Sequence, residues 1–150
     1  MIGWDAYGRC GNLLEDLDVW LAENLQMAKT HRDLLAWQLS MELVEFVYLI
    51  SDSFPSREKF GLVSQMRRAA ISVPSNIAEG AARNTSKQFL QFLFIARGSL
   101  AELQTQLELA KRLGFTSTDT ECHDQTKRLF AILAGLINQV QSQLPNHPIT

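Results

Sequence analysis

The sequence predicts an all-α fold: an up-down-up-down antiparallel four-helix bundle with a kinked second helix and an extra N-terminal segment. Four long segments carry apolar residues at alternating steps of three and four, which is the spacing of helices that pack at shallow angles. Capping residues and short joints separate these segments, so sequence neighbours should pack antiparallel. No competing stretch alternates apolar and polar residues as a half-buried strand would.

The first helix is expected over residues 33–53, and Thr30 with Asp33 supplies its opening cap. The second helix is expected over residues 57–82. Pro74 lies inside it and should kink it, because proline removes one N–H group and clashes with the preceding turn. The apolar spacing continues through the proline, so we expect one kinked helix rather than two.

The third helix is expected over residues 86–113. Thr85 and Gln88 form a capping box at its start. Gly114 should stop it in a left-handed conformation, with Phe115 closing back on the last turn.

The fourth helix is expected over residues 119–143, between a capping box at Thr118 and Glu121 and a stop at Pro145. Each of the four helices should turn one apolar seam toward a common core. The seam residues are Leu34, Trp37, Met41, Val44 and Tyr48; Val63, Met66, Ala70, Val73 and Ile77; Leu93, Ala96, Leu100, Leu103, Leu107 and Ala110; and Leu129, Leu133, Leu136 and Val140.

Composition restricts the function classes. The chain has 150 residues, 46% of them hydrophobic and 20% charged, which excludes a disordered chain, a collagen and a small disulfide scaffold. A net charge of −2 excludes a globally basic nucleic-acid binder but leaves a local basic face open. No apolar run reaches the roughly 18 residues that span a membrane, and we expect no secretory signal because residues 1–5 lack its charged region and apolar run. The two cysteines lack CxxC partners, so we expect reduced thiols in a cytoplasmic protein.

Three regions are expected along the chain: an acidic extension over residues 1–29, the bundle domain over 30–144, and a tail over 145–150. The first 26 residues hold five acidic residues and one basic residue. We expect that these residues either form an appended short helix or result from an upstream start codon chosen in error. A further possibility is that this segment covers a basic face of the bundle and regulates it.

Two helices carry more apolar surface than one bundle needs. In the first helix a second apolar stripe lies nearly opposite the seam, and the third helix also turns apolar residues away from its seam. A helix that is apolar on two sides must be buried on two sides, so we expect a contact between copies of the chain, with coverage by residues 1–26 as the alternative. The expected contact residues are Leu35, Leu39, Leu43, Phe46, Ile50, Leu90, Phe94 and Gly98.

The central part of the chain is basic. Residues 57–97 hold seven basic and two acidic residues, a local net charge of +5. Repetition of this segment in a closed ring would produce a band attractive to phosphates, whereas a merely solvated face is the plainer interpretation. The candidate phosphate ligands are Arg57, Arg68 and Lys87, followed by Arg67, Arg83 and Arg97. No aromatic side chain is obviously presented for base stacking, so we expect little sequence readout.

Catalytic interpretations find little support. The histidines are scattered, and Glu121, Cys122 and His123 point in different directions because they are consecutive helix positions. Residues 75–87 look like a helix-turn-helix, but a recognition helix needs a polar face, and apolar residues follow at once over 89–95. We expect a non-enzymatic protein without a metal or a cofactor.

Several runs of the sequence are similar to one known family. They are Leu34-Leu35-Ala36-Trp37-Gln38, Phe54-Pro55-x-x-Glu58-x-Phe60-Gly61-Leu62, Gln65-Met66-Arg67-Arg68-Ala69-Ala70-Ile71-Ser72-Val73-Pro74-Ser75-Asn76-Ile77-Ala78-Glu79-Gly80, and Phe92-Leu93-x-Ile95-Ala96-Arg97-Gly98-Ser99-Leu100-x-Glu102-Leu103. Over about residues 30–143 the chain resembles the four helix bundle protein family, also called the 23S rRNA intervening-sequence proteins. The resemblance implies an up-down bundle, a ring-shaped homopentamer and no known catalytic activity.

The resemblance also bears on partners. Some members are encoded within inserts in ribosomal-RNA genes, and relatives serve as accessory proteins of diversity-generating retroelements, where a basic pentamer engages a reverse transcriptase and nucleic acid. Those accessories are strongly basic, whereas this chain has a net charge of −2. From the local basic segment and the resemblance together, we expect a homo-oligomer that binds structured RNA or a ribonucleoprotein partner through phosphates. The alternative is a protein-binding scaffold without nucleic-acid contact.

Overall fold

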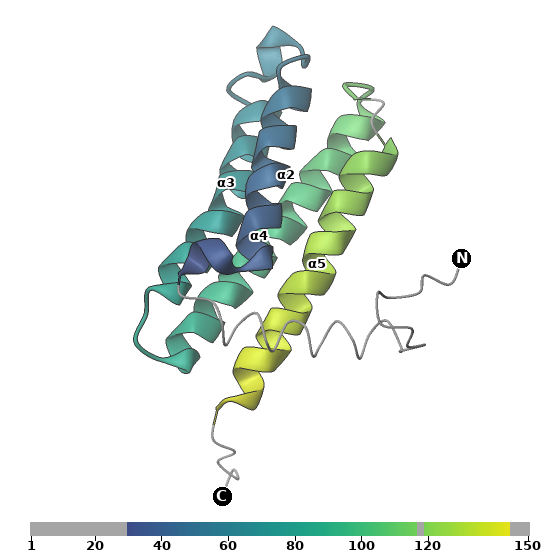
Figure 1. Cartoon of the computed structure of the whole chain (residues 1–150). Coiled ribbons are helices and arrows are strands. Elements are labelled where there is room, and N and C mark those ends of the chain that lie inside the picture. The colour runs from purple at the N-terminus through teal and green to yellow at the C-terminus, as the bar shows by residue number, and fades with distance from the viewer. Residues whose placement is uncertain (1–29, 117–118, 145–150) are drawn as a thin grey trace, which may run out of the picture.

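The chain folds into a bundle of long helices (Figure 1). The computed structural model describes residues 30–116 and 119–144. Its elements are the 3-10 turn η1 (His31–Asp33), helix α2 (Leu35–Ser51), the 3-10 turn η2 (Ser56–Glu58), and helices α3 (Leu62–Ala81), α4 (Ser86–Arg112) and α5 (Asp119–Ser142).

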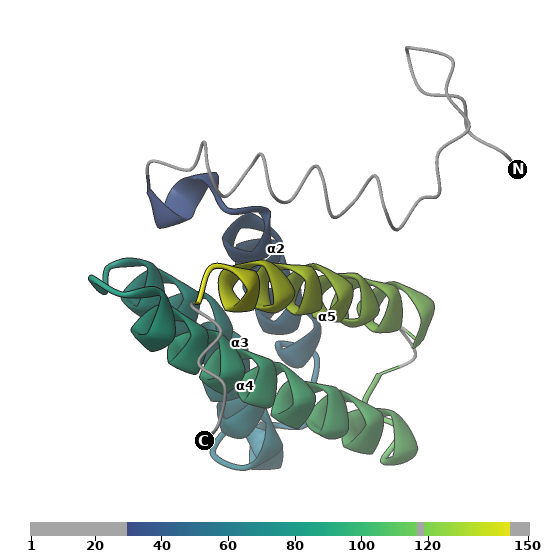
Figure 2. The ribbon, with the colours of Figure 1, turned by 90° about the horizontal axis from the view of Figure 1, so that it is seen from below.

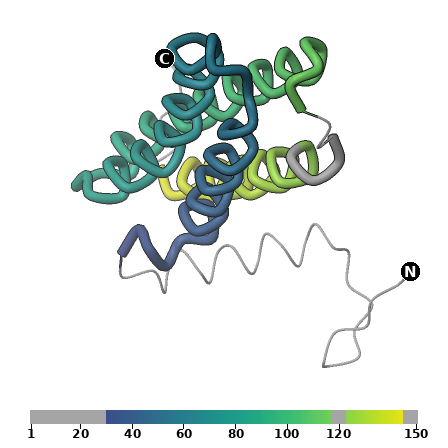
Figure 3. Tube along the Cα trace, turned by 90° about the horizontal axis from the view of Figure 1, so that it is seen from above, coloured from purple at the N-terminus to yellow at the C-terminus, as the bar shows by residue number. Residues whose placement is uncertain are grey.

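The helices follow one another around the bundle in sequence order. Each contacts its sequence neighbour, and α5 returns to contact α2, so α2 and α4 occupy diagonal positions (Figures 2 and 3). Within the described residues there is no strand. The all-α bundle predicted from the apolar spacing is confirmed.

The N-terminal cap forms as predicted but caps a different element. The Asp33 carboxylate accepts the Thr30 N–H at 2.9 Å, and the Thr30 hydroxyl accepts the Arg32 N–H at 3.2 Å. This capping box opens η1, and the backbone then extends at Leu34 before α2 begins at Leu35. The first long helix therefore starts slightly later than residue 33.

Helix α3 begins at Leu62 rather than at residue 57. Residues 56–58 form η2 instead, and the Glu58 carboxylate accepts the Leu62 N–H at 3.4 Å. The helix then runs unbroken through Pro74, which confirms one helix rather than two. The Ser75 hydroxyl donates to the Ile71 carbonyl at 2.8 Å, a local bond of the kind that often accompanies a bent helix.

The ends of α4 form as the sequence predicts. The Thr85 hydroxyl accepts the Gln88 N–H at 3.3 Å at the start of the helix. At the other end Gly114 has φ +71°, and the Phe115 N–H donates to the Ala110 carbonyl at 3.0 Å. This is a Schellman stop. The capping box expected at Thr118 lies outside the described residues.

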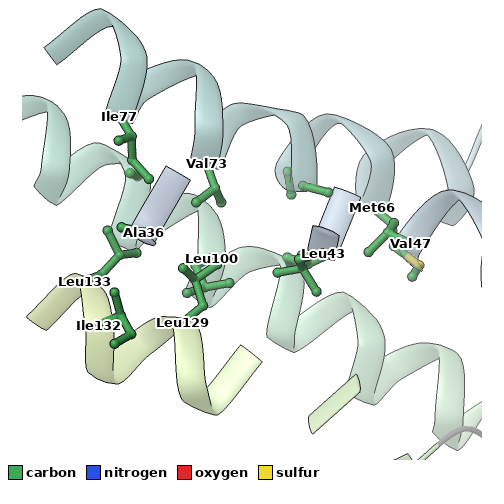
Figure 4. Packing of buried hydrophobic residues seen from close by; sticks show 14 of the residues in the cluster. Ala36, Leu43, Val47, Met66, Val73, Ile77, Leu100, Leu129, Ile132 and Leu133 are labelled. Atoms are coloured by element: carbon green, nitrogen blue, oxygen red, sulfur yellow. The ribbon is translucent and has the colours of Figure 1, made fainter. Parts of the chain in front are cut away.

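The core is a continuous apolar cluster contributed by all four helices (Figure 4). The seams predicted for α3 and α5 are buried along their whole length, and that of α4 is buried except at Leu107, which is half-buried. The largest fully buried side chains are Leu43, Met66, Ile77, Leu93, Leu100, Leu103, Leu129, Leu133, Val47, Val73, Val140 and Thr126.

The seam predicted for α2 is wrong. Met41 and Tyr48 are 37% and 39% exposed, while Ser40 and Val47 point into the core. Ser40 can be buried because its hydroxyl donates to the Trp37 carbonyl at 2.6 Å. The buried line of α2 therefore runs between the predicted seam and the second apolar stripe, and it includes Leu43 and Ile50 from that stripe.

This geometry corrects the predicted contact between copies. Leu43 and Ile50 are only 2% and 9% exposed inside the single chain, so they cannot present a surface to a second copy. Leu35, Leu39, Phe46 and Leu90 are half-buried and pack against the core. Phe94 and Gly98 lie exposed on α4. Coverage by residues 1–26 concerns residues outside the described ranges.

Candidate functional site

Two of the candidate phosphate ligands, Arg68 and Lys87, are exposed cations that have neither an acidic partner nor an aromatic contact in the described residues. Arg68 lies in the second turn of α3 and Lys87 in the first turn of α4, and both side chains are exposed. Among residues 30–116 and 119–144, no carboxylate forms a salt bridge with either of them. Because α3 and α4 are antiparallel, the two cations mark opposite ends of this helix pair.

Arg67 has a structural role instead. Its Nε donates to the Ser51 hydroxyl at 2.9 Å, and a terminal nitrogen lies 2.6 Å from the Asp52 carboxylate. The guanidinium also stacks 4.3 Å from the centroid of the Tyr48 ring. With these contacts Arg67 ties α3 to the C-terminal end of α2, so it has little freedom to bind a phosphate.

Arg57 and Arg83 each have an acidic neighbour. Arg83 forms an i,i+4 ion pair with Glu79 and lies over the Phe92 ring at 4.9 Å. Arg57 approaches Glu58 only to 3.9 Å, and its side chain is 75% exposed. An exposed pair of this length contributes little, so Arg57 remains available to a phosphate while Arg83 is largely engaged.

Arg97 lies on the outer surface of α4. Its guanidinium carbon is 4.9 Å from the centroid of the Phe94 ring, an intrahelical stack at spacing i,i+3. Within the described part of the chain it has no carboxylate partner. The six candidate cations thus do not converge on one patch but spread along the α3–α4 side and the η2 end.

Sequence analysis missed an aromatic side chain. Phe60 is 88% exposed at the end of the bundle where α2 joins α3, and Lys59 Nζ lies 5.6 Å from the centroid of its ring. The expectation that no aromatic is presented for stacking is therefore wrong. The sequence did hold a sign of this exposure. Phe60 stands just before Gly61 and belongs neither to the seam of the first helix nor to that of the second.

The comparison with protein families decides the relationship. A family described as 23S rRNA-intervening sequence protein matches residues 32–138, from η1 into the last turns of α5. The chain belongs to this family. Curated proteins gave no match. In this intervening-sequence protein the matched region contains all six candidate cations and Phe60.

The surface of the described residues carries charged and aromatic side chains. Across them no group of three or more His, Cys, Asp or Glu side chains is placed to hold a metal ion. None of the described helices has the length and hydropathy that crossing a bilayer requires. The described surface presents exposed guanidinium and ammonium groups, which bind phosphates, and the exposed aromatic rings of Tyr48, Phe60 and Phe94, of which Phe60 is the most exposed.

Proposed function

We propose that this protein is a non-enzymatic, cytoplasmic homo-oligomer, a pentamer by family resemblance, that binds structured RNA or a ribonucleoprotein through phosphate contacts. One observation carries the proposal: Arg68 and Lys87 are exposed and lack acidic partners in the described chain, on the basic side of the bundle. Unpaired cations on a folded surface are the groups that phosphates bind.

Repetition gives the phosphate contacts their strength. In one chain, with its net charge of −2, the candidate ligands that remain available among the described residues are Arg57, Arg68 and Lys87, and they lie on three different elements. Each cation that neutralises a phosphate releases a counterion, and this gain grows with the number of contacts. Copies in a ring multiply the contacts, so RNA affinity depends on assembly.

Phe60 adds a second kind of contact. An exposed ring beside Lys59 can stack on an unpaired base while this cation holds an adjoining phosphate. Stacking tolerates any base, so this contact favours single-stranded loops or ends without reading a sequence.

A protein-binding scaffold without nucleic-acid contact is the second candidate. The observation that favours it is the exposed apolar surface on α2 and α4, including Leu49 and Phe94, which phosphate binding does not require. The two candidates differ in their response to charge.

The test is a binding titration of the full chain with a ribosomal-RNA fragment at several salt concentrations. The double variant Arg57→Glu/Arg68→Glu should lose RNA binding and keep its assembly, whereas Arg128→Glu, a charge reversal at an exposed position of α5, should bind as the native chain does. Absence of binding at low salt, or equal affinity of both variants, contradicts the RNA proposal and leaves the scaffold.

A further inference from the structure

One side of α2 carries apolar side chains that the rest of the described bundle covers only in part. Leu35, Leu39 and Phe46 are half-buried and pack against the core, and Leu49 is 72% exposed. These four residues, called here the α2 stripe, share one side of the helix because they recur at intervals of four, seven and three. Apolar surface of this kind indicates a contact that the described residues do not supply.

The α2 stripe lies on the side of α2 that faces away from α3. On the α3 side, the Arg67 guanidinium stacks on the Tyr48 ring at 4.3 Å, and the His31 ring lies 5.3 Å from that of Trp37. Because α2 contacts α3 on one side and α5 on the other, the stripe runs along the α2–α5 edge of the bundle (Figure 2). Among residues 30–116 and 119–144, no ring or guanidinium stacks on this edge of α2.

The N-terminal part of the chain is tethered beside this stripe. Residues 1–29 lie outside the described ranges, and Thr30 caps η1, which leads directly into α2. The five residue steps from Leu25 to Thr30 span at most about 17 Å, whereas a helix with its side chains is about 10 Å wide. A segment that ends at Leu25 is therefore held next to the start of α2, at an effective concentration of about millimolar.

The sequence of this tethered segment has an apolar face. Its leucines recur at intervals of three and four, so in a helix they share one side. Asp16 and Glu23 fall on the opposite side, and Glu15 and Asp18 fall at one edge of the apolar face. A helix that packs by its leucines therefore keeps most of its charge in water. The leucines are Leu14, Leu17, Leu21 and Leu25.

The leucines and the α2 stripe match each other in antiparallel order. Starting from the residues that join them, both sets contain a step of four residues followed by a step of seven. Since every helix rises about 1.5 Å per residue, all pairs come level together. The level pairs are Leu25 with Leu35, Leu21 with Leu39, and Leu14 with Phe46, one turn from Leu49.

We propose that residues 12–25 form a helix that docks on the α2 stripe of the same chain, antiparallel to α2 along the α2–α5 edge. The contact rests on apolar burial rather than on charge, because the acidic residue beside the stripe, Glu42, is exposed and stays in water. The proposal assigns the α2 stripe to the chain's own N-terminal segment and leaves the exposed side chains of α4 to contacts between copies. It holds whether or not the protein binds RNA.

The test is disulfide formation in the full chain, with Cys10→Ser and Cys122→Ser to remove the native thiols. Under oxidised glutathione, Leu21→Cys/Leu39→Cys should form an intrachain disulfide at least about tenfold faster than Leu21→Cys/Met41→Cys. Met41 is the matched control because it is 37% exposed and lies about 200° around α2 from Leu39. Non-reducing electrophoresis distinguishes a disulfide within one chain from one between chains.

Each crosslinking result decides the proposal. A faster Leu39 pair that runs at the mass of one chain supports it. Equal rates for the two pairs, or a faster Met41 pair, overturn it. Disulfides that form only between chains also overturn it, because the stripe would then be covered by another copy.

A second measurement uses the chain with its native cysteines. Leu21→Asp should lower the midpoint of thermal unfolding by at least about 3 °C, because it places a charge in the proposed contact. Val19→Asp adds the same charge on the opposite side of the segment and should leave the midpoint within about 1 °C of the native value. Equal midpoints for the two variants would overturn the proposal even where the disulfide forms.

Discussion

Two glycines in neighbouring helices have opposite surroundings. A Cβ atom at Gly80 would lie 2.6 Å from Phe92 Cβ and 2.9 Å from Phe89 Cδ2, whereas one at Gly98 meets nothing within 4 Å. Gly80 thus lets α3 and α4 approach closely. The sequence could not tell which glycine allows a close helix contact, because that depends on which side of each helix faces a neighbouring helix.

Gly80→Ala should destabilise the fold by about 1–3 kcal/mol, because the added methyl group pushes α4 away from α3. Urea unfolding, followed by circular dichroism below the association concentration, measures this decrease in stability. Gly98→Ala under the same conditions should lose no stability, since its methyl group enters open space. Equal destabilisation of the two variants would contradict the close packing of α3 on α4 at Gly80.

The adjacent pair Arg67 and Arg68 allows a second comparison. Arg67→Ala should cost about 1.5–3 kcal/mol of stability, because its charged hydrogen bonds to Ser51 and Asp52 join α2 to α3. Arg68→Ala should stay within about 0.5 kcal/mol of the native value, since that side chain is exposed. Thermal unfolding checks both, and a stable Arg67→Ala variant would refute the assigned role.

At the scale of elements, the sequence predicted helix existence and stops better than helix orientation. The end of α4 followed from Gly114 and Phe115, because a left-handed stop is a local event. The rotation of α2 did not follow, because its buried line passes through small residues such as Ala36 and Ser40. The apolar spacing gives these residues little weight, and only the positions of the other helices fix the rotation.

The stop of α4 can be tested by itself. Gly114→Ala forces a residue with a Cβ into φ +71°, so it should cost about 1 kcal/mol or slightly more. The midpoint of thermal unfolding measures this cost. An unchanged midpoint would mean that the last turn can end without the left-handed residue.

The candidate site was predicted by residue type more than by location. Net charge along 57–97 indicated the basic side, and Arg57, Arg68 and Lys87 are indeed exposed. Sequence spacing did not reveal that Arg67 is held by Ser51, since that contact joins residues from two helices. It also missed Phe60, whose exposure depends on how the chain turns between α2 and α3.

At the scale of the whole molecule, assembly should strengthen RNA binding, because each copy adds phosphate contacts. Arg68→Ala and Lys87→Ala should each flatten the dependence of log affinity on log salt by about 0.7–0.9 for every phosphate that the variant no longer neutralises. Titrations over a salt series measure this slope. If both variants keep the native slope, the two cations do not bind phosphates.

The central claim is that the chain works as an assembly of copies, because large apolar side chains on α2 and α4 remain exposed within the described residues. The most direct measurement is the molar mass of the full-length protein in solution at micromolar concentration. The account predicts a closed oligomer, with five copies of the 16.9 kDa chain as the expected number. A mass that stays at that of one chain across the concentration range would contradict it.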